Sequence, residues 1–105
     1  MSSNASFDVI LEDAVTSGLE TQLGETAKVL CLYLDPRIAI RKPDFYAKCL
    51  YKCFPVPGKI EILLLAISRR LYEELGIVFE ERKNWKLSDF SDCVLDAKKQ
   101  YEAFQ

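Results

Sequence analysis

Residues suited to acid–base or metal chemistry are scarce in this sequence. The chain has no histidine, which removes the commonest general base and the commonest metal ligand. A cysteine or serine nucleophile would therefore need another base, and no motif supplies one. The four glycines are not clustered, so no glycine-rich phosphate loop is present. We therefore expect a protein that is not an enzyme and that binds no cofactor.

The cysteines are the strongest candidates for a metal site. Cys49 and Cys53 are four residues apart, so on a helix they share one face. Together with Cys31 and Cys93 they could offer four thiolates to zinc, but structural zinc sites usually use CxxC pairs on turns, and the sequence has none. All four have apolar neighbours, and free cysteine behaves as a small buried hydrophobe. We expect no metal and four reduced thiols that fill the core; a disulfide or redox role is the alternative.

Carboxylates occur as neighbours in the sequence. Adjacent residues on a helix point about 100° apart, which makes them poor partners for acid–base catalysis. We expect these residues to form solvated surface. The pairs are Glu12-Asp13, Glu73-Glu74 and Glu80-Glu81.

Basic residues gather in separate segments that could meet in space. A protein held on nucleic acid by its overall field would be basic, whereas this chain has a net charge of −2 and a pI of about 5.2. We do not expect nucleic-acid binding, which would require one continuous patch. Its candidate contacts are Arg37, Arg41, Lys42, Arg69, Arg70, Lys83 and Lys86.

Aromatic residues near the C-terminus are the candidates for an interface with a protein partner. Trp85 lies in a charged segment, and a terminal helix usually frays unless something holds it. Tyrosine and tryptophan are enriched in interface hot spots. The alternative is that these rings pack at the boundary of the chain's own core. The candidate interface consists of Phe79, Trp85, Tyr101 and Phe104.

Helical spacing of apolar residues predicts about five helices that would position these groups. Ser6 can cap a helix that starts at Phe7 and ends near Gly24. The sequence further predicts helices over 25–34, 43–54 and 59–75, with a connecting loop over 35–43. Residues 77–87 are ambiguous, and Ser88 is the expected cap of a last helix.

The segment 59–75 is the most apolar of these helices. A helix that is apolar nearly all round is usually central or at an interface, so we expect it at the centre of the fold. Its continuous apolar face consists of Ile60, Leu63, Leu64, Ile67, Leu71 and Leu75. The expected buried face of the helix before it consists of Phe45, Cys49, Leu50, Cys53 and Phe54.

The length of 105 residues suits one hydrophobic core. We therefore expect an all-α, compact bundle of about five helices, with a single domain over 6–105 and a disordered N-terminus over 1–5. No cationic segment precedes an apolar run at the N-terminus, and no apolar stretch approaches the roughly 20 residues that span a bilayer. These observations predict a cytoplasmic protein without a membrane partner.

Four segments resemble a small archaeal helical family, the Nitrosopumilus-type output domains. The segments are Leu23–Lys28, Lys42–Phe45, Arg70–Gly76 and Asp92–Lys98, within a resemblance that covers roughly 8–99. The resemblance implies a helical signalling-output or interaction module without enzyme activity, and it supplies no catalytic residues. The run Pro55-Val56-Pro57-Gly58 is richer in proline than that family's pattern. The resemblance therefore does not predict the geometry of the turn at this position.

These observations favour a non-enzymatic module for protein interaction or signalling output, which binds a protein partner or a second copy of itself. One alternative is a helical regulator that binds nucleic acid through the basic residues. Another is a small-molecule sensor with an apolar pocket beside the helix over 59–75.

Overall fold

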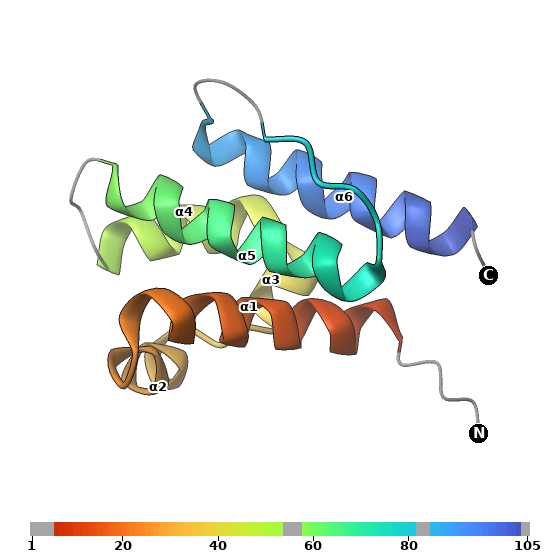
Figure 1. Ribbon diagram of the computed structural model, residues 1–105. Helices are drawn as coiled ribbons and strands as arrows, with labels where there is room; N and C mark the ends of the chain where they lie inside the picture. The colour runs from red at the N-terminus through yellow and green to blue at the C-terminus, as the bar shows by residue number, and fades with distance from the viewer. Residues whose placement is uncertain (1–5, 54–57, 82–84, 104–105) are drawn as a thin grey trace.

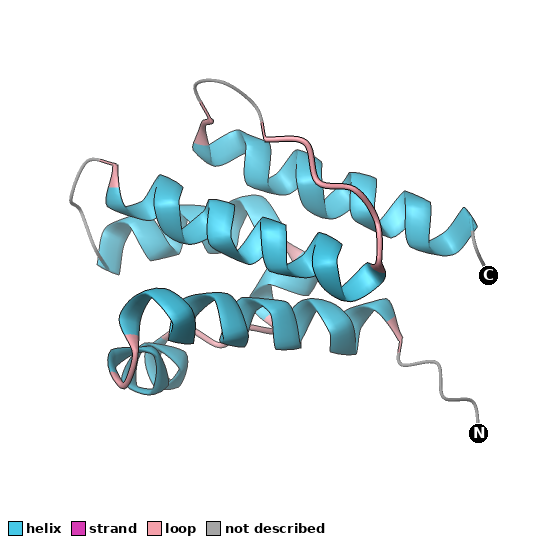
Figure 2. Cartoon of the chain, viewed as in Figure 1, coloured by secondary structure: helices cyan, strands magenta, loops and turns pink. Residues whose placement is uncertain are grey.

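Six helices make up the regular structure of the described part of the chain. A computed structural model describes residues 6–53, 58–81 and 85–103, and these residues form helices and loops without a strand (Figures 1 and 2). The all-α prediction is therefore confirmed. The segment 1–5, which we expected to be disordered, lies outside the described residues. The helices are α1 (Phe7–Leu23), α2 (Thr26–Tyr33), α3 (Ile38–Arg41), α4 (Pro43–Cys53), α5 (Lys59–Leu75) and α6 (Leu87–Ala103).

The ends of α1 and α5 follow local sequence signals. The Ser6 hydroxyl accepts a hydrogen bond from the Val9 N–H at 3.4 Å, as an N-cap residue does. Gly76 has a φ of 72° and ends α5 in a Schellman motif, because the Ile77 N–H donates to the Tyr72 carbonyl at 3.0 Å. No helix in the described part of the chain is both long and apolar enough to cross a bilayer.

Two predicted boundaries are wrong. The expected loop over 35–43 contains α3, because the Asp35 carboxylate accepts the Arg37 N–H at 2.9 Å and starts a turn that continues as a helix. The last helix begins at Leu87 rather than after Ser88. The Asp89 carboxylate accepts the Lys86 N–H at 2.7 Å, which is the returning bond of a capping box.

The buried face of α4 is turned away from the expected face. Phe45 is 51% exposed and Cys53 is exposed, whereas Tyr46 and Leu50 are buried with Ala47 beside them. Contact with α6 selects this face, since the rings of Tyr46 and Phe90 lie 6.4 Å apart. The expected core positions of Phe45 and Cys53 are therefore wrong, and Phe54 lies outside the described residues.

Burial of the cysteines differs from one residue to the next. Cys93 is buried, Cys31 and Cys49 are half-buried, and Cys53 is exposed. The expectation that all four fill the core is wrong for Cys53 because α4 turns that side toward solvent.

The central position predicted for residues 59–75 is confirmed. Helix α5 lies between α1 and α6 and also contacts α4 (Figure 1). Its fully buried side chains include Leu64 and Ile67. Ile62 on the opposite side remains 55% exposed, so the helix is covered on most of its circumference but not on all of it.

Helices α1 and α5 approach each other closely at Gly18. A Cβ atom at Gly18 would lie 2.9 Å from the Ile67 Cα and 2.9 Å from its Cγ1. Real Cβ atoms are essentially never that close to backbone carbon, so a side chain here would force the helices apart. Glycine inside a helix is unfavourable by itself, and the close packing explains its presence.

We expect Gly18→Ala to lower the free energy of unfolding by about 1 kcal/mol. Overpacking typically costs roughly 1–3 kcal/mol, which exceeds the gain of about 1 kcal/mol in helix propensity. Urea denaturation would measure the change, with Gln22→Ala on the exposed side of α1 as a control that changes stability little. A Gly18→Ala protein more stable than the wild type would contradict the close packing.

The Tyr46 hydroxyl is a buried polar group without a hydrogen-bond partner among the described residues. The side chain is fully buried, and its burial raises the pKa of the phenol far above the usual value. An unsatisfied buried donor typically costs about 1–3 kcal/mol. The ring packs well, whereas its hydroxyl group destabilises the fold.

Removal of this hydroxyl should therefore stabilise the protein. We expect Tyr46→Phe to raise the free energy of unfolding by about 1 kcal/mol, as measured by urea denaturation. Tyr72→Phe is the matched control, because the Tyr72 hydroxyl donates to Asp96 at 2.6 Å and its loss should be destabilising. A lower stability of Tyr46→Phe would mean that the hydroxyl has a partner after all.

Candidate functional site

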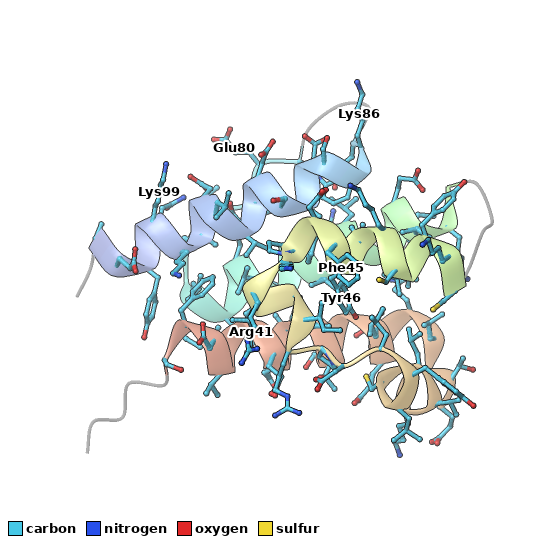
Figure 3. The ribbon with its side chains drawn as sticks, turned by 180° about the vertical axis from the view of Figure 1, so that it is seen from behind. Arg41, Phe45, Tyr46, Glu80, Lys86 and Lys99 are labelled. Carbon is cyan, nitrogen blue, oxygen red and sulfur yellow. The ribbon has the colours of Figure 1, made fainter. Side chains whose placement is uncertain are left out.

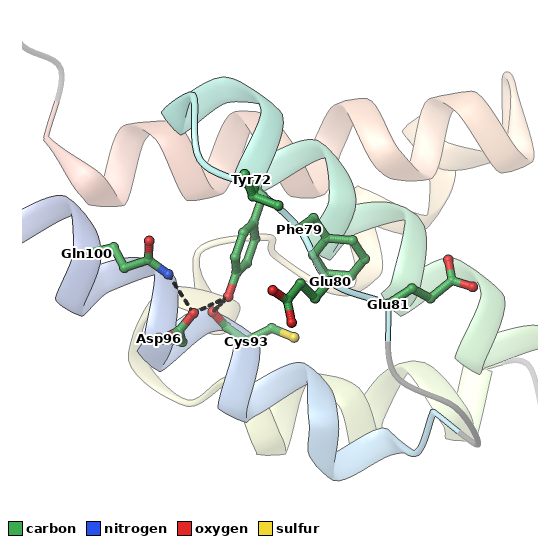
Figure 4. Close-up of a pocket in the computed structure, with 8 residues that line it drawn as sticks. Tyr72, Phe79, Glu80, Glu81, Cys93, Asp96 and Gln100 are labelled. Carbon is green, nitrogen blue, oxygen red and sulfur yellow. Dashed lines mark hydrogen bonds between the residues drawn. The ribbon is translucent and has the colours of Figure 1, made fainter.

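The C-terminal end of α5, residues 78–81 and one side of α6 line a cavity of about 390 Å³, here called the α5–α6 cavity (Figure 4). Its walls combine aromatic rings with carboxylates. The lining residues are Tyr72, Val78, Phe79, Glu80, Glu81, Cys93, Asp96 and Gln100.

The Schellman motif at Gly76 directs the chain out of α5 and alongside α6 (Figure 1). Beyond it, burial alternates along the chain as in an extended segment: Ile77 and Phe79 are half-buried, whereas Val78 is 80% exposed. The Phe79 ring meets the Tyr72 ring edge-on, with centroids 5.1 Å apart and an interplanar angle of 70°. This arrangement brings an aromatic pair to one wall of the cavity.

A hydrogen-bond network joins the Tyr72 side of the cavity to α6. Asp96 Oδ2 accepts a bond from the Tyr72 hydroxyl at 2.6 Å and another from Gln100 Nε2 at 2.8 Å (Figure 4). Gln100 and Asp96 are four residues apart on α6, so one helix presents both side chains. The donors orient the carboxylate without neutralising its charge. No ion pair between Asp96 and a lysine or arginine is present among the described residues.

The candidate interface residues are packed on the core rather than fully exposed. Phe79, Trp85 and Tyr101 are half-buried against it, and Phe104 lies outside the described residues. The Tyr101 ring packs against the Phe7 ring at a centroid distance of 5.9 Å. The role of these residues in an interface stays a prediction.

The two most exposed large apolar side chains among the described residues, Leu32 and Tyr33, lie instead on α2. Leu32 is 86% exposed, Tyr33 is 83% exposed and Val29 is 53% exposed. These residues, spaced by three and four along the helix, form one continuous surface that we call the α2 face. The inward residues Ala27 and Leu30 are buried. Sequence reasoning missed the α2 face, although residues 29–34 contain more large apolar side chains than one buried stripe can use.

A shallow cavity of about 320 Å³ between α1 and α2, here called the α1–α2 groove, adjoins this helix. Ala27, Cys31 and Pro36 contribute to its lining, together with Glu12, Thr16, Glu20 and Lys28. Burial raises the pKa of the Cys31 thiol, and the charges of Glu20 and Asp35 raise it further. A thiol with a raised pKa stays protonated at neutral pH, so the groove is suited to binding rather than to nucleophilic chemistry.

Helix α3 holds one part of the predicted basic set. Arg37 and Arg41 line the same depressions, but Arg37 is paired with Asp35 at 2.8 Å, and Asp8 and Glu12 lie beside both arginines. Figure 3 shows Arg41 and Lys86 far apart on the molecule. Lys42 is exposed next to α3, and Lys83 lies outside the described residues.

Helix α5 holds the other part of the basic set. Arg69 and Arg70 line a separate depression with Gly18. Arg69 pairs with Glu81, and Arg70 pairs with Glu74 at 3.3 Å. The structure therefore divides the predicted basic residues between different places and pairs several of them with acids.

One acidic pair joins α1 to α5, which the sequence reading did not foresee. Burial, together with a hydrogen bond and charge repulsion with Asp13, raises the pKa of Glu74 to about 7, against the lowering effect of Arg70. We expected Glu74 to be solvated surface because adjacent acidic residues on a helix point in different directions. The contact between helices overturns that expectation for this residue.

Stability should fall as pH rises through neutrality because of this carboxyl group. A raised pKa in the folded state means that the proton binds the folded protein more tightly. The stabilisation is complete below the ordinary value of 4.5 and is lost as pH rises through about 7. We expect Glu74→Gln, which mimics the protonated form, to have a higher melting temperature than the wild type at pH 8.

Glu73→Gln is the matched control for this change, because its side chain is 60% exposed on the same turn of α5. The difference in melting temperature between Glu74→Gln and the wild type should shrink between pH 8 and pH 5, whereas Glu73→Gln should show no such trend. Equal pH profiles for both variants would contradict the shifted pKa.

Comparison of the chain with protein-family models, with curated proteins and with solved structures gave no match. The resemblance to the archaeal output domains therefore stays a prediction. In the described residues, no group of three or more cysteine or acidic side chains is arranged to hold a metal ion.

Proposed function

We propose that the protein is a non-enzymatic interaction module that binds a protein partner through the α2 face. The observation that carries this proposal is the exposure of Leu32 and Tyr33, which are 86% and 83% exposed on one side of a helix. Single exposed apolar residues are normal, whereas a continuous apolar surface marks a binding site. The resemblance to helical output domains implies the same class of function.

The energetics of α2 support a binding role. A helix of eight residues is too short to be stable alone in water, and α2 packs mainly on α1. Full burial of a leucine side chain contributes roughly 1.5–3 kcal/mol, so the exposed Leu32 leaves most of that stabilisation unused within the chain. Binding of a partner that covers Leu32 and Tyr33 would be stabilised by this free energy of burial.

The α1–α2 groove defines the chemistry of the partner. Its lining includes Ala27 and Cys31, and the two carboxylates of Glu12 and Glu20 outweigh the one positive charge of Lys28. An amphipathic segment with apolar side chains and a basic residue fits this combination, since its cation would meet the carboxylates while its apolar side contacts α2. Helix α2 is roughly 12 Å long at 1.5 Å per residue, so the interface that it can form is small. A small interface suits a transient complex better than a permanent one.

A photo-crosslinking experiment tests this proposal. We expect p-benzoylphenylalanine in place of Tyr33 to crosslink to a protein partner in extract from the native host. Crosslinking should weaken at least tenfold in Leu32→Ser, because an exposed leucine contributes to binding but little to folding. The photo-reactive residue in place of Tyr51, which is 38% exposed on α4, is the positional control.

Crosslinked pairs of this chain would identify the partner as a second copy, as the sequence suggested. Adducts of equal yield from both positions, or adducts that do not depend on Leu32, would contradict the α2 face as the binding surface. A nucleic-acid adduct would favour the alternative of a nucleic-acid-binding regulator.

A further inference from the structure

We propose that the α5–α6 cavity is a binding site for an organic ammonium group, recognised by the Tyr72–Phe79 aromatic pair together with the carboxylates of Asp96 and Glu80. This site is separate from the α2 face, and neither proposal depends on the other. It lies beside the helix where the sequence suggested an apolar pocket, but its lining is aromatic and acidic.

The aromatic pair is the first element of this site. The rings of Tyr72 and Phe79 stand at 70° to one another, with centroids 5.1 Å apart, and both line the cavity. The negative face of an aromatic ring attracts a cation within about 6 Å of its centroid. The Phe79 ring is only half-buried, so its accessible surface can meet an ammonium group with alkyl substituents.

The negative charge is the second element. Asp96 is already oriented by the Tyr72 hydroxyl at 2.6 Å and by Gln100 at 2.8 Å. Both donors are neutral, so a cation in the cavity would add charge neutralisation that the network lacks. Figure 4 shows the Glu80 carboxylate on the same side of the cavity as the Tyr72 hydroxyl. Glu81 differs from these residues because it pairs with Arg69.

Size and ligand type favour an organic cation over a metal ion. The volume of about 390 Å³ is within the usual range of roughly 300–1,000 Å³ for small-ligand pockets. A calcium ion takes about 6–8 oxygen ligands, whereas aromatic rings form part of this wall and offer none. An alkylammonium group can interact with both parts of the lining, since its alkyl part contacts the aromatic rings and its charge is attracted to the carboxylates. A lysine side chain of another protein and a free amine share this chemistry.

The test is an NMR titration of the full ¹⁵N-labelled chain with n-butylammonium, with n-butanol as the uncharged analogue. We expect saturable shifts around Tyr72, Phe79 and Asp96 with the amine and none with the alcohol. Affinity should fall at least tenfold in Asp96→Asn and in Phe79→Leu. Glu102→Gln removes the same charge from α6 outside the cavity and should bind like the wild type.

Titrations with spermidine and with the peptide acetyl-Ala-Lys-Ala-amide distinguish the two sources of the amine. Tighter binding of spermidine would identify a free amine as the ligand class, and tighter binding of the peptide would identify a protein side chain. If a substituted protein does not fold, Glu80→Gln at an exposed position takes its place. The absence of saturable shifts, or equal affinity in wild type and Asp96→Asn, would overturn the proposal.

Discussion

The close approach of α1 and α5 at Gly18 is the contact on which the remaining structure depends. The absence of a side chain at Gly18 lets the backbone of α1 lie against Ile67, and the interdigitation of the two helices buries Leu11, Val15, Leu64 and Ile67 completely. Burial of such side chains is the main favourable term in folding. Because α1 covers one side of α5, α4 and α6 can pack on its remaining faces.

This central packing determines where binding surfaces can form. Helix α5 ends at Gly76, and its Schellman motif sends the following residues alongside α6, so the α5–α6 cavity forms where the chain leaves the centre of the fold. Helix α2 lies outside the packed layer and rests mainly on α1, which leaves Leu32 and Tyr33 in solvent. The two proposed surfaces thus have different origins: a turn beside the core and a helix at its periphery.

Electrostatic interactions between helices produce features that sequence neighbours do not reveal. Asp13 and Glu74 come from α1 and α5, and burial together with their proximity gives Glu74 a pKa of about 7. Tyr72 and Asp96 come from α5 and α6, and the hydrogen bond between them orients the Asp96 carboxylate at the cavity. Arg69 similarly pairs with Glu81 beyond the end of α5. Each contact requires the helices to be in place first.

The sequence by itself determined the helical class, the cap at Ser6, the end of α5 at Gly76 and the central position of α5, because these depend on local geometry and on apolar spacing. The buried side of α4 was decided only by the tertiary structure. Phe45 and Tyr46 are both large aromatic residues, and Tyr46 is the one that is buried because its ring packs against Phe90 of α6. The exposed α2 face and the α5–α6 cavity were also decided there. Spacing along a chain shows which residues share a side of a helix, whereas only the packing of helices against one another shows which side is covered and which residues from distant segments meet.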